Sequence, residues 1–351
     1  MLKMLQPVLR RRAVAALLLV VAVYTLLLLR VDLQRPLYPL GDSKALLDSS
    51  DRQLQQAKVS MKAAVFLSRR RIRFHIVSDS QAVFDELVAA AEAWPTAYRE
   101  KTSFQFVASW YPPEHEDMKG LFRPCSSQRL FLLHLLPEES AVLYMDSDVI
   151  FLRPPEEFWQ IFHEFDEKQF AAAAVYVGSY HHIPKDVRYS DVGFNAGLML
   201  YNLTRMRQFP AGWEDQVLNI TAEYHSKFKY GDQDILNIFF GKFRSHFRPL
   251  GCEWNLRSFY CKLDIIPVCP EMLNCGAKAV HGTAASFYSP GKLMTFFETW
   301  KAMKMTQSIA EFQAELRTNL AATKPKDKFG CHGRDYIDRI LSQQLISNDV
   351  S

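Results

Sequence analysis

Two aspartates spaced one residue apart, Asp146 and Asp148, are the residues of this chain whose types and spacing suggest chemistry most directly. They fall in an apolar run, residues 143–152, that is typical of a buried strand, at the point where that strand should end. Charged side chains are costly to bury unless they are paired or bind a metal. Two carboxylates at a strand end can share one hard divalent cation, which can bridge the phosphates of a nucleotide. The alternative is an ordinary strand-to-loop transition with two solvated acids.

Amide and carboxyl side chains that could complete a site occur in two later segments. In Gly193–Gly197 the glycines allow the backbone to approach a ligand closely, and Asn195 can both donate and accept hydrogen bonds. Gly231–Asp234 opens a predicted helix, so its carboxylates could bind a ligand or cap the helix.

An imidazole and a guanidinium are the remaining candidates. His281 follows a strand-like pair and could be a third metal ligand or a structural histidine. Arg129 lies on a predicted helix before the aspartate strand, where it could bind phosphate or sugar hydroxyls, or be solvated.

The elements that must position these residues alternate between strand and helix. Such alternation predicts an α/β domain with a mainly parallel central sheet, in which ligands bind at the carboxyl ends of the strands. Asp146 and Asp148 lie at such an end. The predicted helices cover residues 51–67, 82–93, 128–136, 234–240, 294–305 and 308–320. The predicted strands cover residues 73–78, 104–107 and 169–177 besides the run from 143, and residues 194–201 are a further apolar segment.

Composition indicates a globular body and excludes one class of partner. The 351 residues are 48% hydrophobic and 23% charged, enough for one large domain or two small ones. The net charge of +4 comes from 42 basic and 38 acidic residues, which is too balanced for a protein that binds nucleic acid.

The N-terminal region differs from the globular body. Ala13–Leu29 is an apolar run that would be about 25 Å long as a helix, near the lower limit for crossing a bilayer. Lys3 and Arg10–Arg12 precede it, which predicts a cytosolic N-terminus and a lumenal body. A cleaved signal peptide is the alternative, although no small-x-small cleavage site follows in residues 26–34.

Cysteines and glycosylation sequons agree with a lumenal body. The sequence contains no C-x-x-C pair, which favours disulfides over a zinc site and leaves their pairing open. Asn202 and Asn219 begin N-x-T sequons, which are usable only in the lumen. The cysteines are Cys125, Cys252, Cys261, Cys269, Cys275 and Cys331.

Taken in order, these motifs resemble the retaining glycosyltransferases of family 8, which have the GT-A fold, and within that family the glucoside xylosyltransferases. The resemblance covers roughly residues 52–300. It rests on residues 121–132, Asp146-Ser147-Asp148 with Phe151-Leu152-Arg153-Pro154, Asn195-Ala196-Gly197 with residues 202–207, residues 231–238, Cys252-Glu253-Trp254-Asn255 and His281-Gly282.

The resemblance implies a role for each candidate residue. Asp146 and Asp148 match the metal-binding pair, and His281 matches the third protein ligand. Arg129, Asn195 and Ala196 match residues that contact the donor sugar. Asp232 and Gln233 match the catalytic residues at the β face of the reacting carbon. Lys292 matches the lysine that binds the donor phosphates.

The resemblance also implies an activity. A Mn²⁺-dependent enzyme would transfer xylose from UDP-xylose to O-linked glucose on EGF-like repeats of Notch-type proteins, forming an α1,3 linkage. We expect same-face attack rather than an adduct on Gln233, because an amide is a poor nucleophile. The alternatives are a non-catalytic family member that binds glycoprotein and a transferase that uses another UDP-sugar; a metal-dependent hydrolase is disfavoured because no second metal cluster is visible.

These inferences predict a single-pass type II protein of the endoplasmic reticulum or Golgi membrane. Its parts would be a cytosolic tail (1–12), a transmembrane anchor (13–29), a stem (30–57), a GT-A domain (58–300), and C-terminal helices and tail (301–351). One departure from the family concerns the start of the domain, where residues 41–50 contain no convincing strand. A sheet that lacked its first strand would expose edges and lose part of the nucleotide pocket.

Overall fold

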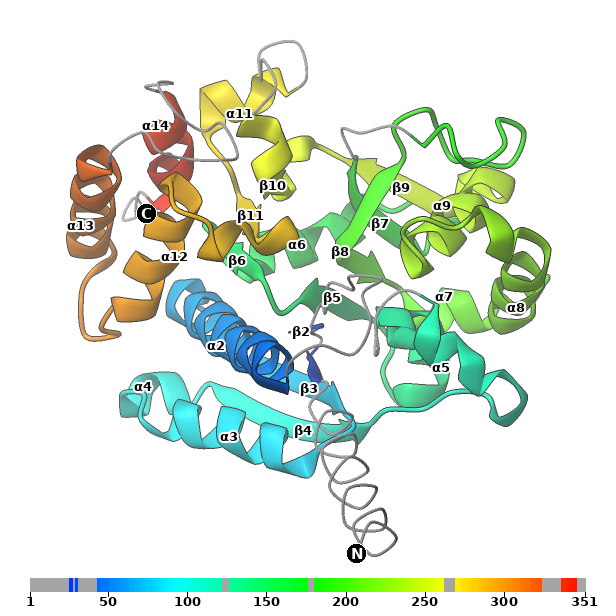
Figure 1. The fold of residues 1–351 in the computed structure, drawn as a ribbon, viewed down its shortest axis with the longest axis horizontal. Helices are drawn as coiled ribbons and strands as arrows, with labels where there is room; N and C mark the ends of the chain where they lie inside the picture. Colours follow the sequence, from blue (N-terminus) through cyan, green and yellow to red (C-terminus); the bar gives the residue numbers. More distant parts are fainter. Residues whose placement is uncertain are drawn as a thin grey trace, which may run out of the picture.

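The computed structural model describes residues 25–27, 29–30, 43–121, 126–175, 180–261, 269–323 and 336–345. They form a mixed α/β structure in which helices cover both faces of a central sheet (Figure 1). The helices are α2 (Ser43–Leu67), α3 (Gln81–Glu92), α4 (Thr96–Arg99), α5 (Leu132–Leu135), α6 (Pro155–Gln160), α7 (Leu203–Arg207), α8 (Trp213–Tyr224), α9 (Asp232–Lys242), α11 (Pro270–Cys275), α12 (Lys292–Ala302), α13 (Ile309–Ala322) and α14 (Tyr336–Ser342).

The central sheet has the strand order β4-β3-β1-β2-β5-β8-β7-β9. The expectation of a mainly parallel sheet is wrong. β8 runs antiparallel to both of its neighbours, and β1 is antiparallel to β2 and β3, while β3–β4, β2–β5 and β7–β9 are parallel. The strands are β1 (Thr25–Leu27), β2 (Leu29–Arg30), β3 (Ile72–Ser78), β4 (Thr102–Ala108), β5 (Val142–Asp146), β7 (Ala171–Val175), β8 (Phe194–Tyr201) and β9 (Phe247–Leu250).

A second, three-stranded sheet carries the histidine to the aspartates. It has the order β10-β11-β6, with β6 (Val149–Phe151), β10 (Leu256–Arg257) and β11 (Ala279–His281). β11 is antiparallel to β6, so that His281 pairs with Val149, the residue after Asp148. Strand pairing therefore brings His281 to the turn that carries Asp148, although the two residues are more than 130 positions apart in the sequence.

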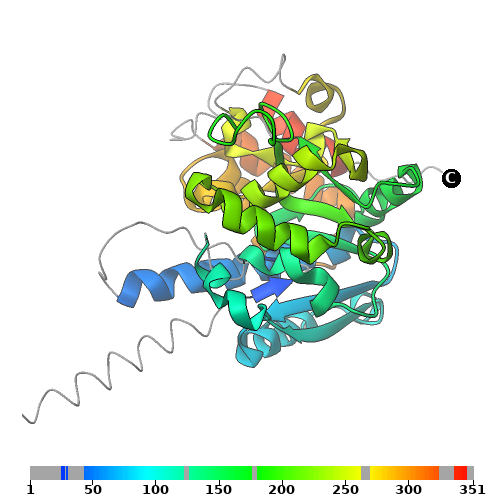
Figure 2. The ribbon, with the colours of Figure 1, turned by 90° about the vertical axis from the view of Figure 1, so that its right-hand side faces the viewer.

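Side chains alternate between two hydrophobic clusters on opposite faces of the central sheet. Leu198 and Leu200 of β8 join a cluster with α2, α3 and α12–α14, whereas Met199 and Tyr201 join a cluster with α5 and α7–α9. Figure 2 shows the ribbon from the side, turned from the view of Figure 1. The aspartate strand β5 is held between these two layers of helices.

The N-terminal expectations need correction at residues 25–27, 29–30 and 43–57. Thr25–Leu27 and Leu29 of the predicted anchor and Arg30 of the predicted stem form β1 and β2, which pair with β3 and β5, so these residues are strand rather than helix. The predicted stem is helical from Ser43, eight residues before the start that we expected for the first helix. The rest of the predicted anchor, residues 13–24 and 28, lies outside the described residues, among which no helix has the length and apolarity to span a bilayer.

Candidate active site

The turn between β5 and β6 carries the two aspartates and is held by backbone contacts from both sides. Ser60 of α2 donates its hydroxyl to the Ser147 carbonyl at 2.6 Å. The Gly282 N–H donates to the Asp148 carbonyl at 2.8 Å. Because these contacts fix the turn between α2 and β11, the two aspartate side chains have little freedom to move away from each other.

Asp146, Asp148 and His281 meet at a buried point. His281 Nε2 lies 3.1 Å from Asp148 Oδ1 and 3.6 Å from Asp146 Oδ2, and the three side chains are at most 6% exposed. One ligand atom from each of the three lies within 4.8 Å of the others. The structure thus brings together the three predicted metal ligands.

The hydrogen bonds of His281 Nδ1 determine which tautomer of the imidazole faces the carboxylates. The Gly197 N–H can only donate, so its partner at 3.1 Å, Asn195 Oδ1, is an oxygen. Asn255 Nδ2 donates to the same oxygen at 2.8 Å, which turns Asn255 Oδ1 toward His281 Nδ1 at 3.1 Å. Asn195 Oδ1 is also 3.1 Å from that nitrogen. With acceptors on both sides, Nδ1 carries the proton.

The remaining nitrogen, His281 Nε2, consequently presents a lone pair to two carboxylates. Neither Nε2 nor Asp148 Oδ1 has a hydrogen-bond partner, although both are buried. Three acceptors facing one another repel unless a cation lies between them. Imidazole nitrogen and carboxylate oxygen are common ligands of divalent cations, and an outer hydrogen bond on Nδ1 is their usual support. The residues therefore fit a divalent metal ion.

Arg129 neutralises the carboxylates on the other side of the site. Its guanidinium is fully buried, lies 3.1 Å from Asp146 Oδ1 and 2.9 Å from Asp232 Oδ2, and donates to the Ala196 carbonyl. It stacks on the Tyr144 ring, 4.5 Å from the centroid. Burial alone would lower the pKa of Arg129, but Asp232, Tyr144 and Asp146 raise it more, so it remains charged. Its observed partners are protein groups, and a contact with the donor sugar stays a prediction.

Tyr144 is a second partner of the Asp146 oxygen that faces away from His281. Its hydroxyl donates to Asp146 Oδ1 at 2.8 Å, the oxygen that Arg129 also contacts. Burial raises the pKa of the Tyr144 phenol well above its ordinary value, against the opposing effect of Arg129, so the phenol stays a donor. Asp146 Oδ2 is left to face His281. Sequence reasoning missed Tyr144, although its position two residues before Asp146 places it on the same face of the strand.

Gln233 and Asn195 form the other half of the site. Gln233 Oε1 accepts from Asn195 Nδ2 at 2.7 Å and from the Ala196 N–H at 3.1 Å, and Gln233 Nε2 donates to the Tyr180 hydroxyl. These contacts join α9 to β8. The structure thus brings Asn195, Ala196 and Gln233 together. It adds Tyr180, which belongs to no quoted motif, and Asn255, which the sequence offered only as the last residue of a motif and without a role.

The two carboxylates at the start of α9 have different partners. Asp232 is fully buried and pairs with Arg129. Asp234 Oδ2 accepts from the Lys229 and Tyr230 N–H groups at 2.6 Å each, and its Oδ1 lies 2.9 Å from His182 Nε2. The structure therefore assigns Asp234 to the turn before the helix and Asp232 to the site.

Lys292 is the predicted site residue that the structure does not bring to this group. It is the first residue of α12, and its ammonium lies 2.9 Å from Asp338 Oδ1 of α14 and donates to the Leu320 carbonyl. Among the described residues, no contact connects it with Asp146, Asp148 or His281. Its assignment to the donor phosphates has no support in this geometry.

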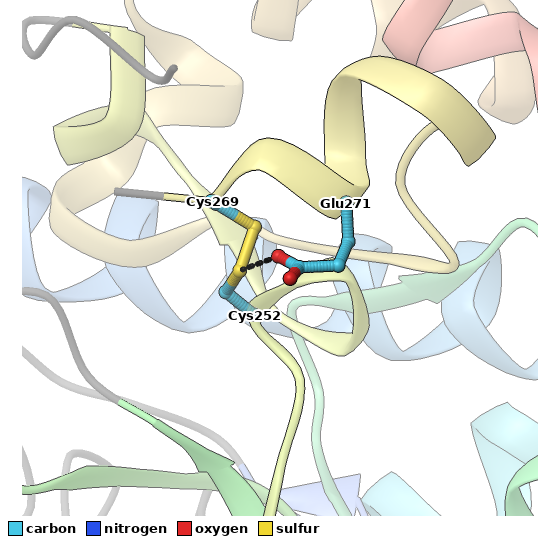
Figure 3. Close-up of side chains that lie close together, drawn as sticks. All are labelled: Cys252, Cys269 and Glu271. Carbon is cyan, nitrogen blue, oxygen red and sulfur yellow. Dashed lines mark hydrogen bonds between the residues drawn. A yellow bond between two sulfur atoms is a disulfide. The ribbon is translucent and has the colours of Figure 1, made fainter. Parts of the chain in front are cut away.

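A disulfide pins the segment before Asn255. Cys252 and Cys269 are joined, with their Cα atoms 6.0 Å apart, and the Glu271 carboxylate lies beside them with Oε2 4.0 Å from Cys252 Sγ (Figure 3). Sulfur atoms in a disulfide are not thiolate ligands, so this group is no zinc site. Cys275 is free, and the side chains of the other three cysteines lie outside the described part of the chain.

The two sequons differ in accessibility. Asn219 is exposed on α8, whereas Asn202 is half-buried and caps α7 by accepting a hydrogen bond from the Arg205 N–H at 3.0 Å.

Comparison with known proteins identifies the family. Residues 43–263, more than half of the chain, match the model of glycosyl transferase family 8. The chain belongs to glycosyltransferase family 8. It is similar to glucoside xylosyltransferase 2 of Mus musculus, with 34% identity over 266 residues, 72% of this chain and 59% of that protein. Glucoside xylosyltransferase 1 of Danio rerio is 34% identical over 249 residues, 65% of this chain and 60% of that protein. The chain thus spans about three fifths of the length of these family 8 relatives.

Solved structures of low sequence identity share the fold of this family 8 chain. Mouse xyloside xylosyltransferase 1 in its apo form is 20% identical, with a TM-score of 0.50 over 66% of this chain and 93% of that one. An active-site mutant of LgtC is 19% identical, with a TM-score of 0.52 over 80% of this chain and 97% of that one. The fold is GT-A-like.

Proposed function

We propose that this chain is a Mn²⁺-dependent retaining glycosyltransferase that transfers xylose from UDP-xylose to O-linked glucose on EGF-like repeats of Notch-type proteins, forming an α1,3 linkage. The observation that carries the metal-dependent part is the approach of the buried His281 Nε2 to the carboxylates of Asp146 and Asp148, at 3.6 Å and 3.1 Å. The donor is supported by the names of the relatives, which are glucoside xylosyltransferases.

Asp146, Asp148 and His281 would hold the metal. A metal ion held there would supply positive charge to neutralise the diphosphate of the nucleotide as negative charge builds up on the leaving group. Arg129 and Tyr144 contact Asp146 Oδ1 and so leave its Oδ2 on the side of His281. Arg129 also holds the buried Asp232 in place through their ion pair, because an unpaired buried carboxylate would be costly.

Gln233 is best suited to positioning the donor. Its Oε1 already accepts two hydrogen bonds, from Asn195 and Ala196, and the carbonyl oxygen of an amide is a weak nucleophile. Asp232 is equally engaged, with Arg129. We therefore favour same-face attack by the acceptor hydroxyl, with its proton passing to the leaving phosphate and with Asp232 and Gln233 orienting the sugar.

A lumenal location completes the proposal. It is supported by the Cys252–Cys269 disulfide, which is typical of oxidising compartments, and by the exposed sequon at Asn219. The basic residues before the apolar run support a type II orientation in the endoplasmic reticulum or Golgi membrane. The strands β1 and β2 take four residues of that run, Thr25–Leu27 and Leu29, into the sheet, so a helical anchor over the whole of residues 13–29 is not compatible with this structure.

The test is transfer from UDP-xylose to an O-glucosylated EGF repeat by the full chain, followed by mass spectrometry. We expect the acceptor to gain one pentose in the presence of Mn²⁺ and none after chelation. Asp148→Asn should reduce turnover at least about a hundredfold, because one ligand loses its charge. Unchanged turnover in that variant would overturn the metal assignment. If the chain bound UDP but transferred no xylose, the donor would be another sugar nucleotide. If it neither bound UDP nor transferred xylose, it would lack this activity.

A further inference from the structure

Asn255 contacts both halves of the candidate site, although no motif assigned it a role. It is 1% exposed and lies between the 3₁₀ turn η6 (Cys252–Trp254) and β10. Its Nδ2 donates to Asn195 Oδ1 at 2.8 Å, and its Oδ1 lies 3.1 Å from His281 Nδ1. A single carboxamide therefore connects the imidazole of the metal group with the amide beside Gln233.

The backbone around Asn255 leaves this side chain little freedom. The Asn255 N–H donates to the Cys252 carbonyl at 3.0 Å, and Cys252 is fixed by the disulfide to Cys269 (Figure 3). On the other side, Leu256 pairs with Val280 in the sheet that carries His281. The carboxamide thus comes from the residue just before β10, and the imidazole from the last residue of the neighbouring strand β11.

The orientation of the carboxamide follows from donors that cannot be reversed. The Gly197 and Ala196 N–H groups identify the oxygens of Asn195 and Gln233, which leaves nitrogen as the end of Asn255 that faces Asn195. If Asn255 were flipped, an oxygen would face the Asn195 oxygen and an NH₂ group would face the protonated Nδ1 of His281. Both contacts would be lost at once, and buried polar groups would be left unpaired.

We propose that Asn255 is a positioning residue that links the metal site to the donor-sugar side of the pocket. Its oxygen holds the proton of His281 on Nδ1 and so directs the Nε2 lone pair to the position between Asp146 and Asp148. Its amide nitrogen holds Asn195, which in turn donates to Gln233. The part that concerns the donor rests on the proposed function, whereas the part that concerns the metal does not.

Two substitutions separate the two contacts. Asn255→Leu has similar volume and removes both hydrogen bonds. Asn255→Asp keeps an acceptor for His281 Nδ1 but replaces the donor to Asn195 with a second acceptor. Asn319→Leu on α13 is the matched control, because it removes a half-buried amide that donates to Thr299 at 3.1 Å, away from the site.

The measurements are Mn²⁺ affinity of the full chain without nucleotide by calorimetry, and the affinities for UDP and UDP-xylose at saturating Mn²⁺, with circular dichroism as the check of the fold. We expect Asn255→Leu to weaken Mn²⁺ binding about 10- to 100-fold, the usual effect of losing the outer partner of a ligating histidine. Asn255→Asp should bind Mn²⁺ at least as tightly as the unsubstituted chain. It should, however, lose the extra affinity of UDP-xylose over UDP.

The outcomes distinguish this proposal from the proposed function. Unchanged Mn²⁺ affinity in a folded Asn255→Leu protein would overturn the role of Asn255 and leave the metal site intact. Equal loss of Mn²⁺ affinity in both Asn255 variants would also overturn it, since the retained acceptor would then have no effect. If the unsubstituted chain bound no Mn²⁺, both the proposed function and this inference would be wrong.

Discussion

At the scale of single residues, Gly197 is a position of the site that has no room for a side chain. A Cβ atom there would lie 2.1 Å from His281 Cε1 and 2.9 Å from Asp146 Oδ2. Both neighbours are buried and held by several hydrogen bonds, so neither can retreat without breaking them. We expect Gly197→Ala to lower the free energy of unfolding by about 1–3 kcal/mol, as overpacking does, and to weaken Mn²⁺ binding. Urea unfolding and calorimetry measure the two effects.

Gly120→Ala is the control for that substitution. Gly120 is exposed at the end of the 3₁₀ helix η1 (Pro113–Gly120), and a Cβ atom there would meet nothing within 4 Å. We expect its unfolding free energy to change by less than about 0.5 kcal/mol. If the two alanine variants were equally stable and bound Mn²⁺ equally, the close approach of β8 to His281 would not be a constraint.

Residue types and their order were enough to predict some members of the candidate site, but neither all of its members nor their contacts. Asp146, Asp148 and His281 could be grouped because carboxylates and imidazole share a preference for divalent cations. The contact of Arg129 with Asp146 and Asp232 depends on strand register, which no single segment encodes. Lys292 shows the same limit, since nothing in its own sequence context indicates the ion pair with Asp338.

At the scale of elements, β3 carries a histidine whose protonation is opposed by burial. His75 is 4% exposed and faces Glu139 from the loop after α5, with Nε2 3.2 Å from Oε1, and Arg73 from its own strand. Burial lowers the pKa of His75, Glu139 raises it, and Arg73 lowers it; the net direction is downward. In the unfolded chain the pKa returns to about 6.5.

This shift predicts how stability depends on pH. Between the lowered folded pKa and about 6.5 the unfolded chain binds more protons, so stability falls as the pH falls below about 6.5. His75→Gln should remove that part of the slope, which urea unfolding between pH 5 and pH 7.5 would measure. The control is His163→Gln, because His163 is exposed; this variant should leave the slope of unfolding free energy against pH unchanged. Parallel stability curves for the chain and for His75→Gln would contradict the prediction.

Elements were predicted best where their periodicity was unambiguous. The helix at 82–93 and the strand at 73–78 agree with α3 and β3 within a residue or two. The apolar run 13–29 was ambiguous, because a long leucine-rich segment suits a membrane helix and a buried strand alike. Its end pairs within the sheet, and only the partner strands β3 and β5 reveal that. The antiparallel direction of β8 could likewise not be predicted from its own residues, because it depends on how the connecting segments lead the chain back to the sheet.

At the scale of the whole molecule, the central sheet is incompletely paired on the side away from the aspartates. β1 pairs with residues 76–78 of β3, and β2 pairs with Met145 and Asp146 of β5. Among the described residues, none pairs with the facing edges of residues 72–75 and 142–144. These edges line a cavity of about 750 Å³, together with side chains of α2 and α6. The cavity lies toward the starts of the two strands, whereas the candidate site lies at the end of β5.

Hydrogen exchange can test this incompleteness residue by residue. The Ile72 N–H donates to the Lys101 carbonyl on the β4 side, so strand alternation turns the Phe74 N–H to the same side and the N–H groups of Arg73 and His75 to the cavity. We expect the Arg73 and His75 amides to exchange at least about tenfold faster than those of Phe74 and Ile76, because an unpaired edge opens without breaking the ladder. Equal protection would mean that a further segment pairs with this edge. The sheet would then be complete, and the expectation that it exposes unpaired edges would be wrong.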